Sequence, residues 1–246
     1  MDTVFGSGLF LPDALLGPAL GAAAARPLFT HYDDATGERV ELSGTTAANW
    51  TAKAANLLRD ELDVEPGSRV SALLPAHWQT ATVLLAVWAC GAELAGDPSG
   101  ADVVLADAAR LDRALGAGAG TVVAFSLDAF GRGLPGLPAG VVDFATEVRV
   151  HGDDFVPWDP VGGDAPAWDG ATGEQVLAAA RERAGALGIG AGDRVLSTTG
   201  WDTADGLRDG LLAVLAAGAS LVQTVNPAPD ALVRRAETER VTLRLG

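Results

Sequence analysis

A repeated segment constrains the fold of this chain more than any other feature of its sequence. Residues 67–70 read Gly-Ser-Arg-Val, and residues 192–195 read Gly-Asp-Arg-Val, 125 positions later (192 − 67). An apolar run into Gly91-Ala92 is likewise matched by a run into Gly218-Ala219, at an offset of 127 (218 − 91). Matches that keep their order along the chain indicate a duplicated unit of helix, strand, helix and strand.

The residues in and around both copies favour parallel sheets covered by helices. Apolar residues at helical spacing precede a turn at Pro66-Gly67 and an apolar strand over 69–74. A strand at 103–106, a helix at 108–115 and a strand at 121–125 then make a βαβ unit, whose crossover is right-handed in nearly all proteins. We therefore expect an α/β fold of two pseudo-repeated lobes, with mainly parallel sheets flanked by helices.

The expected domains are two lobes joined by a linker. The first lobe covers residues 1–151 and includes an N-terminal leader and a hairpin over 27–42, whose turn lies at 33–37. It also includes a short helix over 142–150. The linker covers 152–172, where prolines and glycines interrupt any periodicity. The second, shorter lobe covers 173–246, which includes the second copy of the repeat.

Charge and hydropathy exclude several classes of partner. The net charge is −15, whereas nucleic acids and anionic membranes reward clusters of Lys and Arg. No basic segment precedes an apolar run at the N-terminus, and no apolar run reaches the length of a membrane span. We expect an acidic, cytoplasmic protein that binds neither nucleic acid nor membrane.

Cysteine and histidine give no sign of a metal centre. Cys90 is the only cysteine, so the chain has no intrachain disulfide, and its apolar surroundings indicate a buried, inert thiol. His31, His77 and His151 are scattered without the spacing of metal ligands. The sequence therefore predicts no metal site and identifies no catalytic residue.

The order of the motifs resembles the N-terminal part of the adenylate-forming superfamily, which includes the acyl-CoA synthetases. The resemblance rests on the turn and strand at 66–70, the Leu-Pro step at 74–75 and the helix that runs into Gly91-Ala92. It also rests on their counterparts at 188–195, 211–219 and 239–242. It covers residues 27–245 and is strongest to a short, actinobacterial-type family of unassigned activity. The resemblance implies the fold of the N-terminal subdomains of those enzymes.

Departures from the superfamily pattern imply lost chemistry. Its members bind ATP phosphates with a loop ending in Pro-Lys-Gly, but the corresponding residues 163–173 hold no lysine and include Asp164 and Asp169, which repel phosphate. Thr203 stands where the superfamily often has a histidine that contacts the acyl group. The C-terminal lid with its catalytic lysine is expected to be missing beyond Gly246, and Lys53 is the only lysine. The resemblance thus implies a degenerate, non-catalytic relative with no supported cofactor, ATP and AMP included.

Two other functions stay open. One is a module that binds a nucleotide, an acyl group or another small molecule; the other is an enzyme of unfamiliar mechanism, or half of a split adenylate-forming ligase. A partner protein or a homodimer is also open, since Trp158, Trp168 and Trp201 gather near the linker and second copy. Open α/β sheets bind ligands at the carboxyl ends of their strands. The ligand-binding residues predicted on that basis are His77, Trp78, Asp97, Thr198, Thr199, Trp201, Asp202 and Thr203.

Overall fold

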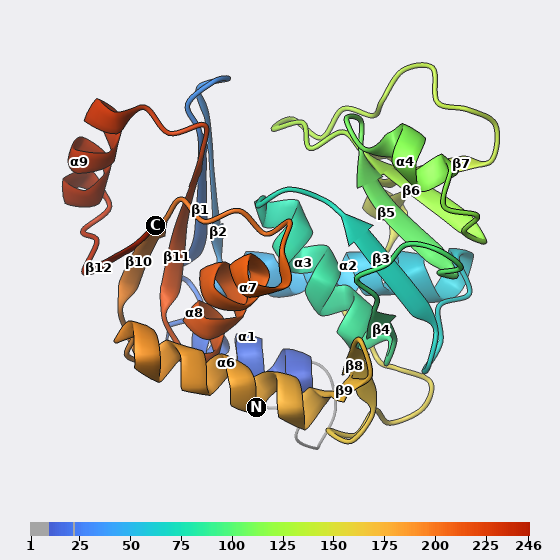
Figure 1. Cartoon of the computed structure of the whole chain (residues 1–246), viewed down its shortest axis with the longest axis horizontal. Coiled ribbons are helices and arrows are strands. Elements are labelled where there is room, and N and C mark those ends of the chain that lie inside the picture. Colours follow the sequence, from blue (N-terminus) through green and yellow to red (C-terminus); the bar gives the residue numbers. More distant parts are fainter. Residues whose placement is uncertain (1–9, 22) are drawn as a thin grey trace. The chain divides into compact units, whose positions relative to one another are not determined.

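A computed structural model describes residues 10–21 and 23–246, which form two compact units, each with its own sheet (Figure 1). Unit 1 combines residues 10–13 with 48–75 and 82–176. Unit 2 combines residues 14–47, 76–81 and 177–246. The expected leader before Phe10 lies outside the described residues.

The sheet of unit 2 has five strands, and only its edge strand β2 is antiparallel. The hairpin of β1 and β2, which we expected in the first lobe, belongs here because β1 pairs in parallel with β11, with Phe29 opposite Leu221. The expected boundary at 151 is corrected by this pairing. The run Leu-Phe-Thr-His of β1 is buried throughout, as in a strand whose sheet is covered on both faces. In spatial order the strands are β12 (Leu243–Leu245), β10 (Arg194–Ser197), β11 (Ser220–Val225), β1 (Pro27–Asp33) and β2 (Glu38–Ser43).

The sheet of unit 1 has seven strands, and all pairs are parallel except β8 with β9. The segment expected to be a linker contributes β8 and β9, because Trp168 pairs with Leu94 and the Trp88 indole N–H donates to the Ala167 carbonyl at 2.8 Å. In spatial order the strands are β7 (Val141–Asp143), β6 (Thr121–Phe125), β5 (Val103–Asp107), β3 (Arg69–Leu73), β4 (Glu93–Leu94), β8 (Pro166–Trp168) and β9 (Ala171–Thr172).

The expected helix over 142–150 is wrong at its start. Residues 141–143 extend as β7, and the Asp143 carboxylate then accepts the Thr146 N–H, which begins a short helix. The helices are α1 (Leu11–Leu20), α2 (Gly44–Glu61), α3 (Trp78–Ala89), α4 (Leu111–Leu115), α5 (Phe144–Glu147), the 3-10 helix η1 (Val148–Val150), α6 (Gly173–Leu187), α7 (Ala204–Leu207), the π-helix η2 (Arg208–Leu212), α8 (Ala213–Ala216) and α9 (Pro229–Thr238).

The repeat seen in the sequence is also a structural repeat. Its copies are α2-β3-α3-β4 and α6-β10-α7-η2-α8-β11. In the first, the Gly67 N–H donates to the Gly91 carbonyl at 3.0 Å; in the second, the Gly192 N–H donates to the Gly218 carbonyl at 3.2 Å. Gly91 and Gly218 have φ of 74° and 71°, a conformation open to glycine and costly for other residues. The α/β fold of two pseudo-repeated lobes is therefore confirmed.

Each sheet packs apolar side chains against its helices. In unit 1, Leu73, Val104 and Val122 pack around Ala114 of α4. In unit 2, α9 lies on one side of the sheet and α7 and α8 on the other, and Ala236 of α9 packs on Leu196 and Val222 (Figure 1). Among the described residues, no helix combines the length and the apolarity that crossing a bilayer requires.

Candidate functional site

The carboxyl ends of the parallel strands in unit 2 carry a group of buried polar residues. The loop after β10 is fastened there, because the Gln223 side-chain amide of β11 donates to the Thr199 carbonyl at 3.1 Å. The Thr198 N–H donates to the Leu245 carbonyl of β12 at 3.2 Å. Ligand sites of open α/β sheets lie at such strand ends.

Two histidines and a glutamate meet beside this strand end. His31 lies in the middle of β1, opposite Gln223 of β11. His77 immediately precedes α3, and its Nδ1 accepts the Gln79 N–H at 3.2 Å, so the imidazole acts as the helix N-cap. The two rings are 4.4 Å apart between centroids and 71° apart in orientation. Glu38, the first residue of β2, places Oε1 3.5 Å from His77 Nε2.

This cluster, His31 with Glu38 and His77, is buried and incompletely hydrogen-bonded. His31 is 2% exposed and His77 is 4% exposed. His31 Nδ1, Glu38 Oε1 and His77 Nε2 are inaccessible to solvent and lack a hydrogen-bond partner. The 3.5 Å approach of Glu38 to His77 is longer than a good N–H···O bond. Buried polar atoms nearly always have a hydrogen-bond partner. Three unpaired polar atoms in one place therefore mark a candidate ligand-binding site.

The electrostatic setting keeps His31 neutral. Burial, with a smaller contribution from the neighbouring His77, lowers the pKa of His31 to about 3, although Asp33 opposes the shift. At neutral pH the imidazole therefore carries no charge and keeps one nitrogen lone pair. Neutral imidazole and carboxylate are the forms in which these side chains bind metal ions.

The spacing of the histidines along the sequence did not predict that two of them would be in contact. His31 and His77 are 46 positions apart (77 − 31), yet their rings touch because one lies on a strand and the other at a helix start. Sequence reasoning also missed Glu38 and Gln223. A signal existed for His31, since a histidine inside the apolar run 28–32 must find a buried polar partner.

The structure divides the predicted ligand-binding residues between the two units. Asp97 lies in unit 1, exposed, with its carboxylate accepting the Ser99 N–H at 3.0 Å in a turn. The other seven lie in unit 2. His77 and Trp78 are buried with ring centroids 5.5 Å apart, whereas Asp202 is exposed.

The remaining predicted residues hold the loop after β10 in place. Thr203 caps α7 by accepting the Gly206 N–H at 3.1 Å. Trp201 is 6% exposed and packs on Gly210, where an added Cβ would come within 2.9 Å of the indole nitrogen. That nitrogen is buried without a hydrogen-bond partner. Thr199 contributes its backbone carbonyl, which Gln223 occupies.

The segment at the place of the superfamily's phosphate loop is tied into unit 1. Its backbone N–H groups donate to protein acceptors: Gly170 to the Glu93 carboxylate, Thr172 to Gln175 Oε1 at 2.9 Å, and Gly173 to the Ala165 carbonyl at 3.0 Å. The Asp169 carboxylate in turn accepts the Gly96 N–H at 2.9 Å. These amides are therefore not available to cradle a phosphate.

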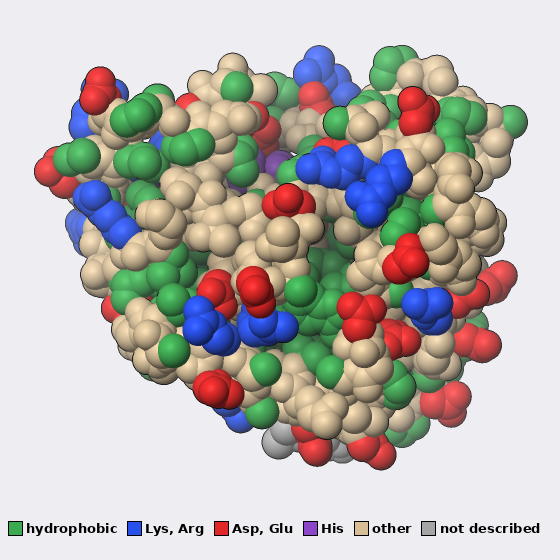
Figure 2. Space-filling model, viewed as in Figure 1, with side chains coloured by type: hydrophobic (Ala, Val, Ile, Leu, Met, Phe, Trp, Pro, Cys, Tyr) green, Lys and Arg blue, Asp and Glu red, His purple; other side chains and the backbone are tan. Residues whose placement is uncertain are grey.

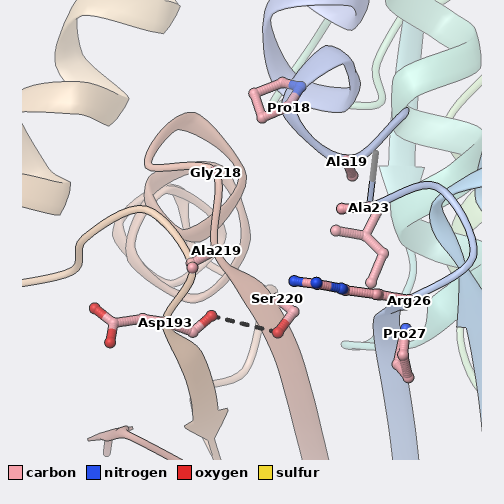
Figure 3. A pocket seen from close by; sticks show the side chains of 11 residues that line it. Pro18, Ala19, Ala23, Arg26, Pro27, Asp193, Gly218, Ala219 and Ser220 are labelled. Carbon is pink, nitrogen blue, oxygen red and sulfur yellow. Dashed lines mark hydrogen bonds between the residues drawn. The ribbon is translucent and has the colours of Figure 1, made fainter. Parts of the chain in front are cut away.

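A cavity of about 120 Å³ opens at the amino ends of β10 and β11 in unit 2. Arg26 points its guanidinium toward Ser220, whose hydroxyl donates to the Asp193 carbonyl at 3.3 Å (Figure 3). The Ala219 and Ser220 N–H groups already donate to backbone carbonyls. The cavity thus offers one exposed cation and no free amide from these two residues.

Solved structures that are similar to this chain include acyl-CoA synthetases and CoA ligases. An acyl-CoA synthetase from Brucella canis has a TM-score of 0.78 and 18% identity, over 97% of this chain and 47% of that chain. An acetoacetyl-CoA synthetase from Streptomyces lividans has a TM-score of 0.72 and 22% identity, over 94% and 42%. A benzoate CoA ligase from Burkholderia xenovorans LB400 has a TM-score of 0.72 and 20% identity, over 96% and 50%.

The fold is thus that of the N-terminal region of acyl-CoA synthetases, and the chain spans about half the length of these structures. No model of a protein family matches the chain. A TIGR03089 family protein from Mycobacterium tuberculosis (strain ATCC 25618 / H37Rv) is 55% identical over 237 residues, covering 94% of this chain and 96% of that protein. The chain belongs to the TIGR03089 family.

Proposed function

We propose that this protein is a degenerate relative of the acyl-CoA synthetases that no longer forms acyl-adenylates. The observation that carries the proposal is the segment 163–173. It holds no lysine, and its amides at Gly170, Thr172 and Gly173 are bonded within unit 1. Asp164 and Asp169 add negative charge where a polyphosphate would have to bind.

The single lysine of the chain is also engaged in other contacts. Acyl adenylation builds negative charge between the carboxylate and the α-phosphate, and enzymes stabilise such charge with preorganised cations and N–H donors. The single lysine, Lys53, donates to the His151 carbonyl at 2.5 Å and pairs with Asp153 at 2.8 Å. On the face drawn in Figure 2, basic side chains are interspersed with acidic ones.

Exchange of labelled pyrophosphate into ATP tests the proposal directly. The protein is incubated with ATP·Mg and a panel of short, long and aromatic carboxylates, beside an active acyl-CoA synthetase as positive control. We expect no exchange above the rate without protein. Exchange that depends on a carboxylate and is lost in Lys53→Ala would overturn the proposal and restore an enzymatic role.

A second candidate function is a small-molecule-binding module at the carboxyl ends of the strands in unit 2. The observation that favours it is that Trp201 Nε1 and Gln223 Oε1 are both buried without hydrogen-bond partners near the loop after β10. A thermal-shift titration with ATP·Mg, AMP, CoA and an acyl-adenylate analogue tests this role. A ligand at one hundred times its Kd stabilises by about 2.7 kcal/mol. A shift that Trp201→Phe reduces supports the module, and a flat response to all four rejects these ligand classes.

A further inference from the structure

We propose that His31, Glu38 and His77 form a binding site for a divalent transition metal ion of the Zn²⁺ class. Each residue offers one ligand atom, and these atoms all lie within 4.8 Å of one another. His31 is nine-tenths or more buried, and its Nδ1 has no hydrogen-bond partner. The proposal does not depend on whether the chain has lost adenylation.

The donor set decides the class of metal. Two imidazole nitrogens with one carboxylate oxygen suit Zn²⁺, Co²⁺, Ni²⁺ and Fe²⁺, whereas Mg²⁺ and Ca²⁺ prefer oxygen ligands alone. Three protein ligands leave a tetrahedral ion one open position for water or another small ligand. An ion between the three atoms would satisfy His31 Nδ1, Glu38 Oε1 and His77 Nε2 together.

The fold holds the three ligands in place from three different elements. His31 lies inside β1, between β11 and β2. Glu38 begins β2, directly after the exposed residues 35–37 of the hairpin turn. His77 immediately precedes α3, so its backbone is held at the helix start. Ligands on a sheet and a helix start are positioned more rigidly than ligands on a free loop.

His77 must change its tautomer to bind the ion. In the present arrangement Nδ1 accepts the Gln79 N–H, so in neutral His77 the ring proton sits on Nε2, toward Glu38. On binding, the Nε2 proton leaves to solvent and another proton is taken up at Nδ1, so the count of protons is unchanged. Losing the Gln79 hydrogen bond weakens binding by about tenfold, a small part of the affinity that three ligands supply.

The third histidine supplies a matched control. His151 lies in unit 1, and its Nε2 is 3.1 Å from Glu61 Oε1. This pair has the chemistry of His77 and Glu38, but no second histidine completes a cluster among the described residues. A site that requires all three ligands should therefore form around His77 and not around His151.

Competition of the protein with a chromophoric chelator for Zn²⁺ at pH 7.5 measures the site, and the visible absorption of added Co²⁺ reports its coordination. We expect one ion per chain with a Kd below about 10 µM, a modest affinity for a buried three-ligand site. Glu38→Gln and His77→Asn should each weaken binding by about a hundredfold, at least as much as losing a group that orients a ligand. His151→Asn should leave it unchanged.

His77→Asn is chosen because asparagine is also a good N-cap and can accept the Gln79 N–H, so α3 keeps its start. Far-UV circular dichroism and the metal-free melting temperature check that the variants fold. A wild-type Kd weaker than about 10 µM overturns the proposal. So does one-to-one binding that Glu38→Gln and His77→Asn leave unchanged, or that His151→Asn abolishes.

Discussion

The two copies of the repeated unit share a backbone and differ in what their side chains do with it. In the first copy, the Glu93 N–H donates to the Ser68 carbonyl at 2.8 Å; in the second, the Ser220 N–H donates to the Asp193 carbonyl at 2.9 Å. The strand that follows each copy is placed in the same way, since Asp102 and Thr242 donate their N–H groups to the carbonyls of the two matched arginines.

Those arginines show how far the copies have diverged. Arg69 of the first copy has a side chain 46% exposed and lies 3.9 Å from Glu93. Arg194 of the second is 15% exposed, donates to Thr30 at 2.8 Å and pairs with Glu239 at 2.5 Å. The turn and its glycines thus keep the backbone geometry the same in both copies. The contacts of the side chains differ, because different elements pack over each sheet.

Lowering the pH should give the largest difference in stability between the sheets that hold the two copies. The pKa of His31, in the sheet of the second copy, is about 3, chiefly because of burial, against an ordinary value of 6.5. Between these values the unfolded chain binds more protons than the folded one, so stability falls as the pH is lowered through this window. At 1.36 kcal/mol for each pKa unit, the loss from His31 reaches about 3 kcal/mol by pH 4.

Glu239 acts in the same direction at lower pH. Although burial opposes it, hydrogen bonds from Tyr32, Arg194 and Arg39 hold the pKa of Glu239 at about 2, so its contribution is lost as the pH falls from 4.5 toward 2. Urea unfolding from pH 7 to 4, with amide exchange, should show β1 and β11 losing protection before β3 and β5. His31→Gln should flatten the dependence above pH 4.5. A wild-type free energy of unfolding that stays constant over this range would contradict the expectation.

The second-largest expected difference concerns the helical segment between the two strands of each copy. In the first copy, α3 is regular and contains no glycine; in the second, α7 passes into the π-helix η2, and Gly206 lies against the loop after β10. A Cβ at Gly206 would come within 2.1 Å of the Gly200 carbonyl oxygen. We expect Gly206→Ala to cost about 3 kcal/mol of unfolding free energy, because backbone must move.

A helical glycine with open space around it is the control. Gly185 of α6 would meet nothing within 4 Å on gaining a Cβ. Gly185→Ala should therefore stabilise by about 0.5–1 kcal/mol through helix propensity alone. Urea denaturation of both variants compares them; equal effects would mean that the contact with Gly200 does not constrain the second copy.

The matched arginines give the smallest of the three effects. Arg194→Ala should destabilise by about 2 kcal/mol, since Glu239 keeps Arg39 and Tyr32 but loses its shortest ion pair. Arg69→Ala removes an exposed, long contact and should cost less than about 1 kcal/mol. Chemical denaturation of the two variants under one condition is the measurement, and losses of similar size would show that the copies had not diverged at this position.

Local patterns in the sequence predicted the repeat, because each of its turns rests on a glycine and each strand on a short apolar run. The pairing of β1 with β11 was beyond such patterns, since it joins residues nearly two hundred positions apart. Nothing in residues 27–43 specifies which sheet will accept them; only the packed core does. This is why the expected lobe boundary failed while the helices and strands themselves were found.

The candidate sites also differ in whether local sequence features could predict them. The missing lysine of residues 163–173 could be read directly, but the bonds that occupy the amides of Gly170 and Gly173 could not. The His31, Glu38 and His77 cluster escaped because spacing rules detect ligands carried by one loop or one helix. Here the ligands come from the strand β1, the first residue of β2 and the residue before α3, and they meet only after the sheet of unit 2 has formed.

The parallel pairing of β1 with β11 can form only late in synthesis of the chain. Phe29 leaves the ribosome 192 positions before its partner Leu221 (221 − 29), which at 5–20 residues per second is a wait of about 10–40 s. The strands of unit 1 lie closer together along the chain and can assemble meanwhile. During that interval β1 can pair with β2 alone, and its other edge, with Leu28 and Phe29, is open to strands of other molecules. A nascent chain therefore carries an unpaired strand edge in this hairpin until β11 has been made.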